Sequence, residues 1–136
     1  MNITAALLAS LNVTRAQFDI RCEEIAAAVA SSDRLALAAV CRIYDRQTAD
    51  EKNADRTVHL NGIGFQECDA KFGGKVARLH RKGYTIFPDK MDRVRRMAVK
   101  YRRQLTVLSF LKERAKREEL TWRLRDDDTW VNDAAA

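Results

Sequence analysis

The chain has 136 residues, which fits one domain and leaves little room for a second. Hydrophobic residues make up 46% of the sequence, enough to form a core, so a wholly disordered chain is excluded. The 25 Lys and Arg residues outnumber the 19 Asp and Glu residues, and the resulting net charge of +6 favours an acidic partner without identifying it.

The sequence also disfavours a membrane-spanning or a secreted protein. No apolar run approaches the roughly 18 to 20 residues that a bilayer-spanning helix needs. The apolar stretch near the start lacks the basic residues that precede it in a signal peptide. Cys22, Cys41 and Cys68 are odd in number and widely spaced, which disfavours a disulfide framework. We therefore expect a cytoplasmic protein with reduced, buried thiols and no membrane contact.

The first half of the chain is predicted to be helical, because residues 1–61 contain neither glycine nor proline. A short helix is expected from Thr4 to Leu11. A second helix is expected to begin near Asn12 or Thr14, either of which can cap free N–H groups. The apolar positions of this second helix have 4-3-4 spacing and define one face: Phe18, Cys22, Ile25 and Val29.

A third helix is predicted after the sequence Ser31-Ser32-Asp33, which supplies a stop and a new cap. With so short a joint, the second and third helices are expected to form an antiparallel hairpin. The side chains that the third helix directs toward the core are Leu37, Val40, Cys41 and Tyr44. From Gln47 to Arg56 the pattern turns polar, so the helix is expected to end there.

The middle of the chain holds all five glycines and the single proline, between Gly62 and Pro88. An irregular connection is expected at 57–66, where Asn61-Gly62-Ile63-Gly64 could be a phosphate loop or a plain turn. The turn is favoured, because a dinucleotide-binding loop needs a third glycine and a preceding strand.

A helix capped by Asp69 is predicted next, with Phe72, Val76 and Leu79 buried. Gly73 and Gly74 weaken this helix by about 1 kcal/mol each relative to alanine, which indicates a kink or the close approach of another segment. Gly83 is the expected C-terminal stop, and Pro88 suits the first turn of the following helix.

The last helix is predicted to run from Pro88 to about Arg125, ending before the acidic run at 126–128. An unbroken helix of that length would span about 55 Å, so it must bend, with 106–109 as the candidate position, or project and pair with a partner. The residues that share its apolar stripe are Met91, Val94, Ala98, Tyr101, Leu105 and Leu108.

Together these elements predict an all-α fold of four to five helices over 1–125, with a long basic C-terminal helix. An acidic, mobile tail is expected at 126–136. Trp122 and Trp130 are candidates to dock either on the domain or on a partner.

Positive charge is concentrated in one segment. Residues 71–103 carry 12 basic and 2 acidic side chains, a net +10, whereas 1–70 carry −3 and 104–136 carry −1. The segment has the order helix, turn, helix, as in a helix-turn-helix unit, with Tyr84 and His80 near the turn and able to stack on a base or bond a phosphate. The predicted nucleic-acid-binding residues are Lys71, Lys75, Arg78, Arg81, Lys82, Arg93, Arg96, Lys100 and Arg103.

This concentration predicts a nucleic-acid-binding protein, with DNA favoured over RNA and with backbone contacts dominating. The alternative is a solvated helix face whose arginines pair with the acidic N-terminal part. The local +10 exceeds the −3 of residues 1–70, so pairing within the monomer would be incomplete.

Catalysis and metal binding are not predicted. Glu67, Asp69 and Lys71 resemble the acidic-plus-lysine sets of metal-dependent nucleases, but they border a helix rather than adjacent strands. The set Cys41, His59, Cys68 and His80 lacks the tight ligand spacing of a zinc site. We therefore expect a protein that is not an enzyme and has no cofactor.

Three strings of residues resemble a small module of phage and other mobile-element proteins that also occurs beside helicase-type domains. They are Arg46-Gln47-Thr48-Ala49-Asp50-Glu51, Asn61-Gly62-Ile63-Gly64-Phe65 with Asp69-Ala70-Lys71-Phe72, and Lys100-Tyr101-Arg102-Arg103-Gln104-Leu105. The resemblance covers about 40–105 and implies a role near nucleic-acid processing or phage–host conflict. The chain departs from the module at Phe87, where a capping Ser or Thr usually precedes the proline, and at Gly73-Gly74.

Two other functions stay open. One is a phage-encoded, anti-CRISPR-like inhibitor or adaptor that binds a host protein or ribonucleoprotein complex involved in defence or nucleic-acid processing. The other is a homodimer paired through the C-terminal helix at Met91, Val94, Tyr101 and Leu108.

Overall fold

The computed structural model describes residues 1–47, 63–124 and 130–132. Within these ranges the fold is helical, as the sequence predicts, and a short antiparallel strand pair follows the last helix. The helices are α1 (Ala5–Leu11), α2 (Arg15–Ser31), α3 (Asp33–Asp45), α5 (Glu67–Arg81), α6 (Pro88–Lys100) and α7 (Arg102–Thr121). The strands are β1 (Trp122–Leu124) and β2 (Trp130–Asn132), with Arg123 opposite Val131.

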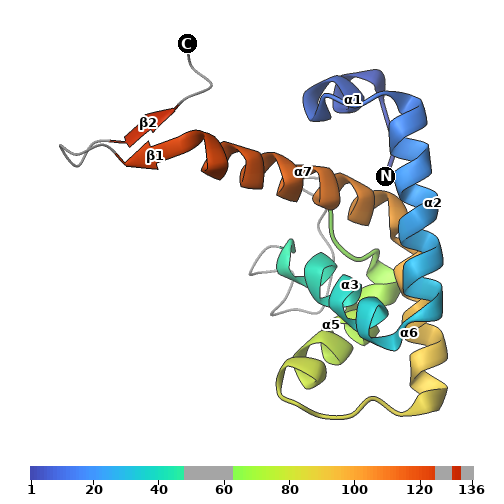
Figure 1. Cartoon of the computed structure of the whole chain (residues 1–136). Helices are drawn as coiled ribbons and strands as arrows, with labels where there is room; N and C mark the ends of the chain where they lie inside the picture. The colour runs from blue at the N-terminus through green and yellow to red at the C-terminus, as the bar shows by residue number, and fades with distance from the viewer. Residues whose placement is uncertain (48–62, 125–129, 133–136) are drawn as a thin grey trace.

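The packing is organised around α6, which lies beside α2 and against α3 (Figure 1). Helix α5 packs on α3, and α7 packs on α2 after turning away from the direction of α6. The main core draws on α2, α3, α5, α6 and α7, and its fully buried members include Ile43, Phe65 and Val94. A second, smaller core lies under α1, where Phe18 of α2 meets Phe110 of α7.

The predicted starts of the N-terminal helices are confirmed. The Thr14 side chain accepts a hydrogen bond from the Gln17 N–H, and the Gln17 side chain accepts one from the Thr14 N–H, forming a capping box. Ser32 caps α3 in the predicted joint. The expected antiparallel hairpin does not form, because α3 leaves the end of α2 obliquely and packs mainly on α5 and α6 (Figure 1).

The prediction of one long helix after Pro88 is wrong. The chain breaks at Tyr101, whose φ of −94° and ψ of 18° are not helical, and α7 continues in a new direction. This break makes six helices in the described part of the chain, against the four to five expected. Neither glycine nor proline marks the position, and the helix is interrupted at Tyr101 rather than at 106–109, which lie within α7.

Tertiary contacts hold this break in place. The Tyr101 hydroxyl accepts a hydrogen bond from the Gln66 N–H at 2.7 Å, and its ring meets Phe65 edge-on at 5.5 Å between centroids. Three residues later, Gln104 bonds both backbone groups of Gly64. These partners are 35 to 40 residues away in the sequence, so a local pattern does not reveal the break.

The sequence left open whether the glycine pair in α5 marks a kink or the close approach of another segment, and the structure shows a close approach. The helix is continuous through Gly73, and the ring of Phe65 lies directly on it. A Cβ at Gly73 would fall 2.6 to 2.9 Å from three carbons of that ring. Another segment of the same chain therefore requires a glycine here.

The two ends of α5 differ from the prediction in one respect. Gln66 occupies the N-cap position without a side-chain bond, so the expected cap by Asp69 is wrong. Asp69 instead lies in the first turn, where its carboxylate binds residues of the α6–α7 break. The predicted stop at Gly83 is confirmed, since Gly83 has a φ of +86° and its N–H bonds the His80 carbonyl.

The end of the chain also differs in detail. Helix α7 stops at Thr121 rather than Arg125, and Trp122 and Trp130 lie in the paired strands. Residues 126–129 and 133–136 of the predicted mobile tail lie outside the described residues, as do the turn at Asn61-Gly62 and most of the connection at 57–66. The described part of that connection, 63–66, is irregular as expected.

Candidate nucleic-acid interface

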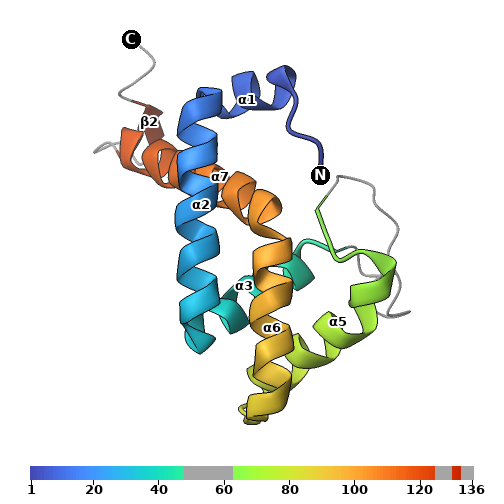
Figure 2. The same cartoon turned by 90° about the vertical axis from the view of Figure 1, so that its right-hand side faces the viewer.

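The predicted basic segment maps onto two neighbouring helices and the turn that joins them. Figure 2 shows α5 beside α6, joined at the end of the molecule opposite α1. The cations lie on α5, on the connection, on α6 and on the first turn of α7. They are Lys71, Lys75, Arg78, Arg81, Lys82, Lys90, Arg93, Arg95, Arg96, Lys100, Arg102 and Arg103.

On α5, Lys71 and Lys75 lie four residues apart and both are exposed. Lys82 extends the same face past the end of the helix and is also exposed, while Arg78 between them is half-buried. The opposite face carries the buried Gly73, Gly74 and Ala77. The basic face of α5 is therefore the face that points away from the core.

On α6, the predicted stripe consists of Arg93, Arg96 and Lys100, and all three are exposed. Arg93 places its guanidinium 3.9 Å from the ring centre of Phe72 on α5, so the stripe borders α5. Arg103, the last member of the predicted stripe, lies beyond the break on α7 and is exposed.

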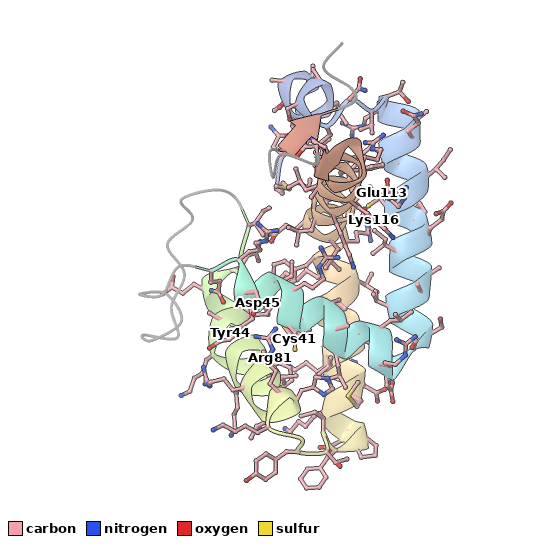
Figure 3. All side chains as sticks on the ribbon, turned by 60° about the vertical axis from the view of Figure 1, so that its left-hand side comes forward. Cys41, Tyr44, Asp45, Arg81, Glu113 and Lys116 are labelled. Carbon is pink, nitrogen blue, oxygen red and sulfur yellow. The ribbon has the colours of Figure 1, made fainter. Side chains whose placement is uncertain are left out.

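Part of the positive charge is paired within the chain. Arg81 donates two hydrogen bonds to the Asp45 carboxylate, at 2.5 and 2.6 Å, and so joins α5 to α3 (Figure 3). These hydrogen bonds raise the pKa of Arg81. Arg95 pairs with Asp33 and with Asp92. The solvated-face interpretation is therefore correct for these two cations.

Lys100 is the third paired cation. Its Nζ lies 2.7 Å from Oδ2 of Asp69, and the same oxygen accepts the Tyr101 hydroxyl at 2.7 Å. The Asp69 side chain is only 14% exposed, so this carboxylate is held mostly away from water. The bond to Asp69 raises the pKa of Lys100, and burial raises the pKa of Tyr101 above its usual range.

Seven cations of the basic segment have no ion-pair partner within the described residues and keep their charge available. Within the described residues, none of the following has an ion-pair partner: Lys71, Lys75, Lys82, Lys90, Arg93, Arg96 and Arg103. Together they cover α5, the connection, α6 and the start of α7, so the excess charge seen in the sequence extends over neighbouring elements of the fold.

Residues of the three family-like strings meet around the break. Gln104 bonds Gly64, Tyr101 contacts Phe65, and Asp69 bonds Tyr101. From the first string, Gln47 is buried, and its side chain would lie 3.1 Å from a Cβ at Gly64. In this structure these residues hold the α5–α6–α7 arrangement together, and they are therefore structural supports of the basic surface.

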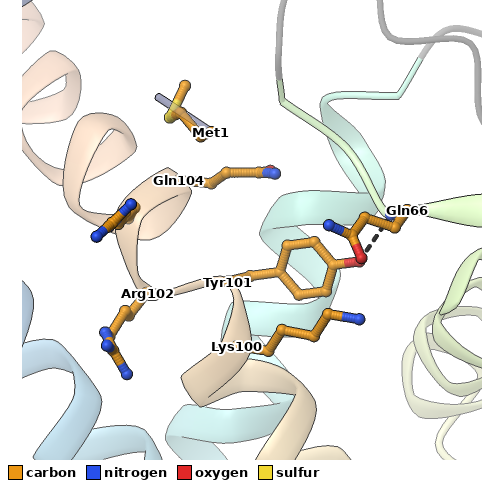
Figure 4. Close-up of a pocket in the computed structure, with 7 residues that line it drawn as sticks. Met1, Gln66, Lys100, Tyr101, Arg102 and Gln104 are labelled. Atoms are coloured by element: carbon orange, nitrogen blue, oxygen red, sulfur yellow. Dashed lines mark hydrogen bonds between the residues drawn. The ribbon is translucent and has the colours of Figure 1, made fainter. Parts of the chain in front are cut away.

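A polar pocket of about 230 Å³ lies next to the break (Figure 4). Lys100 extends toward Gln66 in this view, and Arg102 extends away from it. The lining residues are Met1, Gln66, Lys100, Tyr101, Arg102, Arg103 and Gln104. The predicted residues Lys100 and Arg103 thus line one pocket, although Lys100 is already engaged by Asp69.

The structure also describes most of the residues considered as a nuclease-like set or as metal ligands. Glu67 and Lys71 are exposed while Asp69 is engaged by Lys100 and Tyr101. Within the described residues, no three His, Cys, Asp or Glu side chains are placed to hold a metal ion. His59 lies outside the described residues. Cys22 and Cys41 are buried as expected, but Cys68 is exposed.

The surface required by the dimer hypothesis is not free. Met91, Val94, Tyr101 and Leu108 all lie in the main core, packed against helices of the same chain. The apolar stripe that could have paired two copies is thus used in folding.

Among the described helices, none combines the length and apolarity needed to cross a membrane.

Two exposed aromatic rings lie on this surface, and the sequence identified one of them. Tyr84 and Phe87, in the α5–α6 connection, are 62% and 71% exposed. The sequence indicated Tyr84 as a stacking residue but not Phe87. The available signal was the missing cap before Pro88, because a phenylalanine at that position makes no side-chain cap bond.

Comparison of the chain with protein-family models, curated proteins and solved structures found no match.

Proposed function

We propose that this protein binds nucleic acid, without catalysing a reaction, through the accessible cations of residues 71–103. The observation that supports the proposal is the set of unpaired cations on α5, α6 and the start of α7 within the described residues. Unpaired Lys and Arg side chains on neighbouring elements create a positive potential, which draws in a polyanion and releases its counterions.

The contacts are proposed to be mainly with phosphates. Lysines on α5 and arginines on α6 are long side chains at helical spacing, which suits a row of phosphates. Arg93 is held over Phe72 and so has a fixed position from which its guanidinium can meet a phosphate. Binding should therefore be strongly salt-dependent and only weakly dependent on sequence.

The test uses fluorescence anisotropy with labelled duplex and single-stranded DNA and RNA of about 20 nucleotides, titrated over a range of salt concentrations. The variant replaces four exposed cations with glutamine: Lys71→Gln, Lys75→Gln, Arg96→Gln and Arg103→Gln. Arg93 and Lys100 are left intact because they contact Phe72 and Asp69. Affinity should fall about tenfold or more, and the salt slope should shrink by about one for each phosphate that the variant no longer binds.

The matched control removes the same charge elsewhere. It carries Lys112→Gln, Lys116→Gln, Arg117→Gln and Arg34→Gln, all at exposed positions outside the basic segment; Figure 3 shows Lys116 on α7. An equal loss in the control would reduce the effect to net charge and overturn the assignment to this surface. Absence of wild-type binding at low salt would overturn the function. A host-protein complex that survives nuclease digestion would then favour the inhibitor or adaptor.

A further inference from the structure

Two aromatic rings project from the connection between α5 and α6. Tyr84 and Phe87 are among the large apolar side chains that the described residues expose, at 62% and 71%. The connection lies at the end of the molecule opposite α1 (Figure 2). Exposure of so much ring surface to water is unfavourable, so these rings contribute little to folding and are available to a partner.

The backbone that carries the rings is held at both ends. The Tyr84 N–H bonds the Leu79 carbonyl at 3.1 Å and the Gly83 N–H bonds the His80 carbonyl at 3.0 Å, which closes α5 in a Schellman motif. Pro88 opens α6 and fixes its own φ. Ile86, between the two rings, packs against the main core. The rings are thus presented by an anchored turn.

The surroundings of the rings are basic. Lys82 precedes Tyr84, Lys90 follows Phe87, and both are exposed without an ion-pair partner among the described residues. Asp89 is exposed as well, in the first turn of α6, where the helix dipole stabilises a carboxylate. From this turn the unpaired cations continue along α5 and α6.

Exposed aromatic faces beside cations fit unpaired nucleotides, whose bases offer flat π surfaces and whose backbone is anionic. In a duplex, the bases are already stacked and paired, so the two rings would find no free faces without distorting it. Tyr84 and Phe87 are three residues apart, a Cα separation of at most about 11 Å, so both can reach one short stretch of strand.

We propose that Tyr84 and Phe87 form a stacking platform for the unpaired bases of single-stranded nucleic acid, whose phosphates follow the neighbouring cations. This inference rests on the proposed function and specifies its ligand. It predicts a preference for single strands, and for duplexes with a single-stranded overhang, over blunt duplexes of the same length.

The test replaces both rings with leucine in the full chain, as Tyr84→Leu/Phe87→Leu. Leucine retains apolar area but has no π face, so a protein or membrane partner that only buries apolar surface would tolerate it. Affinity for a labelled single strand of about 20 nucleotides should fall about fivefold or more per ring. Duplex affinity and the salt slope should stay unchanged. Ile20→Ala, at a similarly exposed site on α2, is the matched control.

A second variant tests stacking directly. Phe87→Trp keeps a ring in the turn, and its fluorescence should be quenched by single-stranded but not by blunt duplex DNA, beyond any change in the wild type. The stacking platform would be overturned by leucine variants that bind single strands as tightly as the wild type. It would equally be overturned if single strands left the fluorescence of the Phe87→Trp variant unaffected. In either case, intact salt-dependent binding would leave the proposed function standing, whereas absence of all wild-type binding would remove both.

Discussion

Tyr101 shows how one residue links the parts of this fold. It ends α6, its ring lies on Phe65, and its hydroxyl accepts from the Gln66 N–H and donates to Asp69. It is only 4% exposed, so these contacts lie largely away from water. A buried hydroxyl with two partners is costly to remove and sensitive to ionisation.

These contacts predict a pH-dependent stability. Burial, reinforced by the bond to Asp69, raises the pKa of Tyr101 above the value of about 10 that tyrosine has in an unfolded chain. The unfolded state therefore loses its proton first as the pH rises. Stability from this group is complete below about pH 10 and declines above it, by up to about 1.4 kcal/mol per pH unit.

The measurement is urea unfolding of the wild type and Tyr101→Phe between about pH 8 and 11. At about pH 8 the variant should be less stable by about 1 to 3 kcal/mol, because the Gln66 N–H and Asp69 lose a partner. The difference should narrow above about pH 10. A difference that stays constant over the whole range would contradict the assignment. Tyr84→Phe, at an exposed site, should change neither value.

At the scale of single residues, the sequence predicted well wherever the cause is local. Thr14, Ser32 and Gly83 do what capping and stop residues do, because their partners lie within a few residues. Asp69 was assigned as a cap by the same logic, and it is not one. Its carboxylate is taken by Lys100 and Tyr101, which lie 31 and 32 residues away.

At the scale of elements, the start of α6 departs from the usual capping rule, because the residue at its N-cap position has no side-chain acceptor. Pro88 occupies the first turn as expected, but Phe87 at the N-cap position makes no side-chain cap bond and leaves its ring exposed. A serine there would supply an acceptor for a free N–H of the first turn. Phe87 therefore adds little to the stability of the α6 N-terminus, whether or not it takes the stacking role that we propose.

We therefore expect Phe87→Ser to stabilise the protein by about 0.5 to 1 kcal/mol, measured as a shift in the denaturant midpoint at constant m-value. The same variant should bind single strands more weakly. Ser32→Ala, which removes an existing cap from α3, should destabilise by a similar amount and calibrates the scale. A destabilised Phe87→Ser would mean that the ring packs more than its 71% exposure indicates.

The elements themselves were mostly predictable, with one exception. Apolar spacing and the position of the glycines located α1, α2, α3 and α5 to within a few residues. The division of the last helix into α6 and α7 was not predictable, since the stripe from Met91 to Leu108 continues through the break. Contacts from residues 64–66 select the break, and these residues lie far from it in the sequence.

At the scale of the whole molecule, some cations of the basic segment are paired within the chain, whereas seven have no ion-pair partner among the described residues. The Arg81–Asp45 pair joins α5 to α3 at the surface, with both side chains 46% exposed. Pairs so exposed contribute little to stability, because water and salt screen them. Their larger effect is on the potential around the basic surface, since each carboxylate offsets one cation that could meet a phosphate.

Asp45→Asn should therefore strengthen nucleic-acid binding, by up to about fivefold at low salt, with about one more unit of salt slope. Its free energy of unfolding should change by about 1 kcal/mol or less. The control is Asp19→Asn, which makes the same change in net charge at an exposed pair with Arg15 on α2. Equal gains from both variants would show that net charge, not this surface, sets the affinity.

The sequence by itself determined the helical class, most helix boundaries and the place where positive charge accumulates, since these depend on composition and short-range spacing. Only the tertiary structure decided which cations are paired with Asp33, Asp45 and Asp69, where the last helix breaks, and that Phe87 faces water. Those outcomes depend on contacts between residues that are tens of positions apart, and local spacing in the sequence does not reveal such contacts.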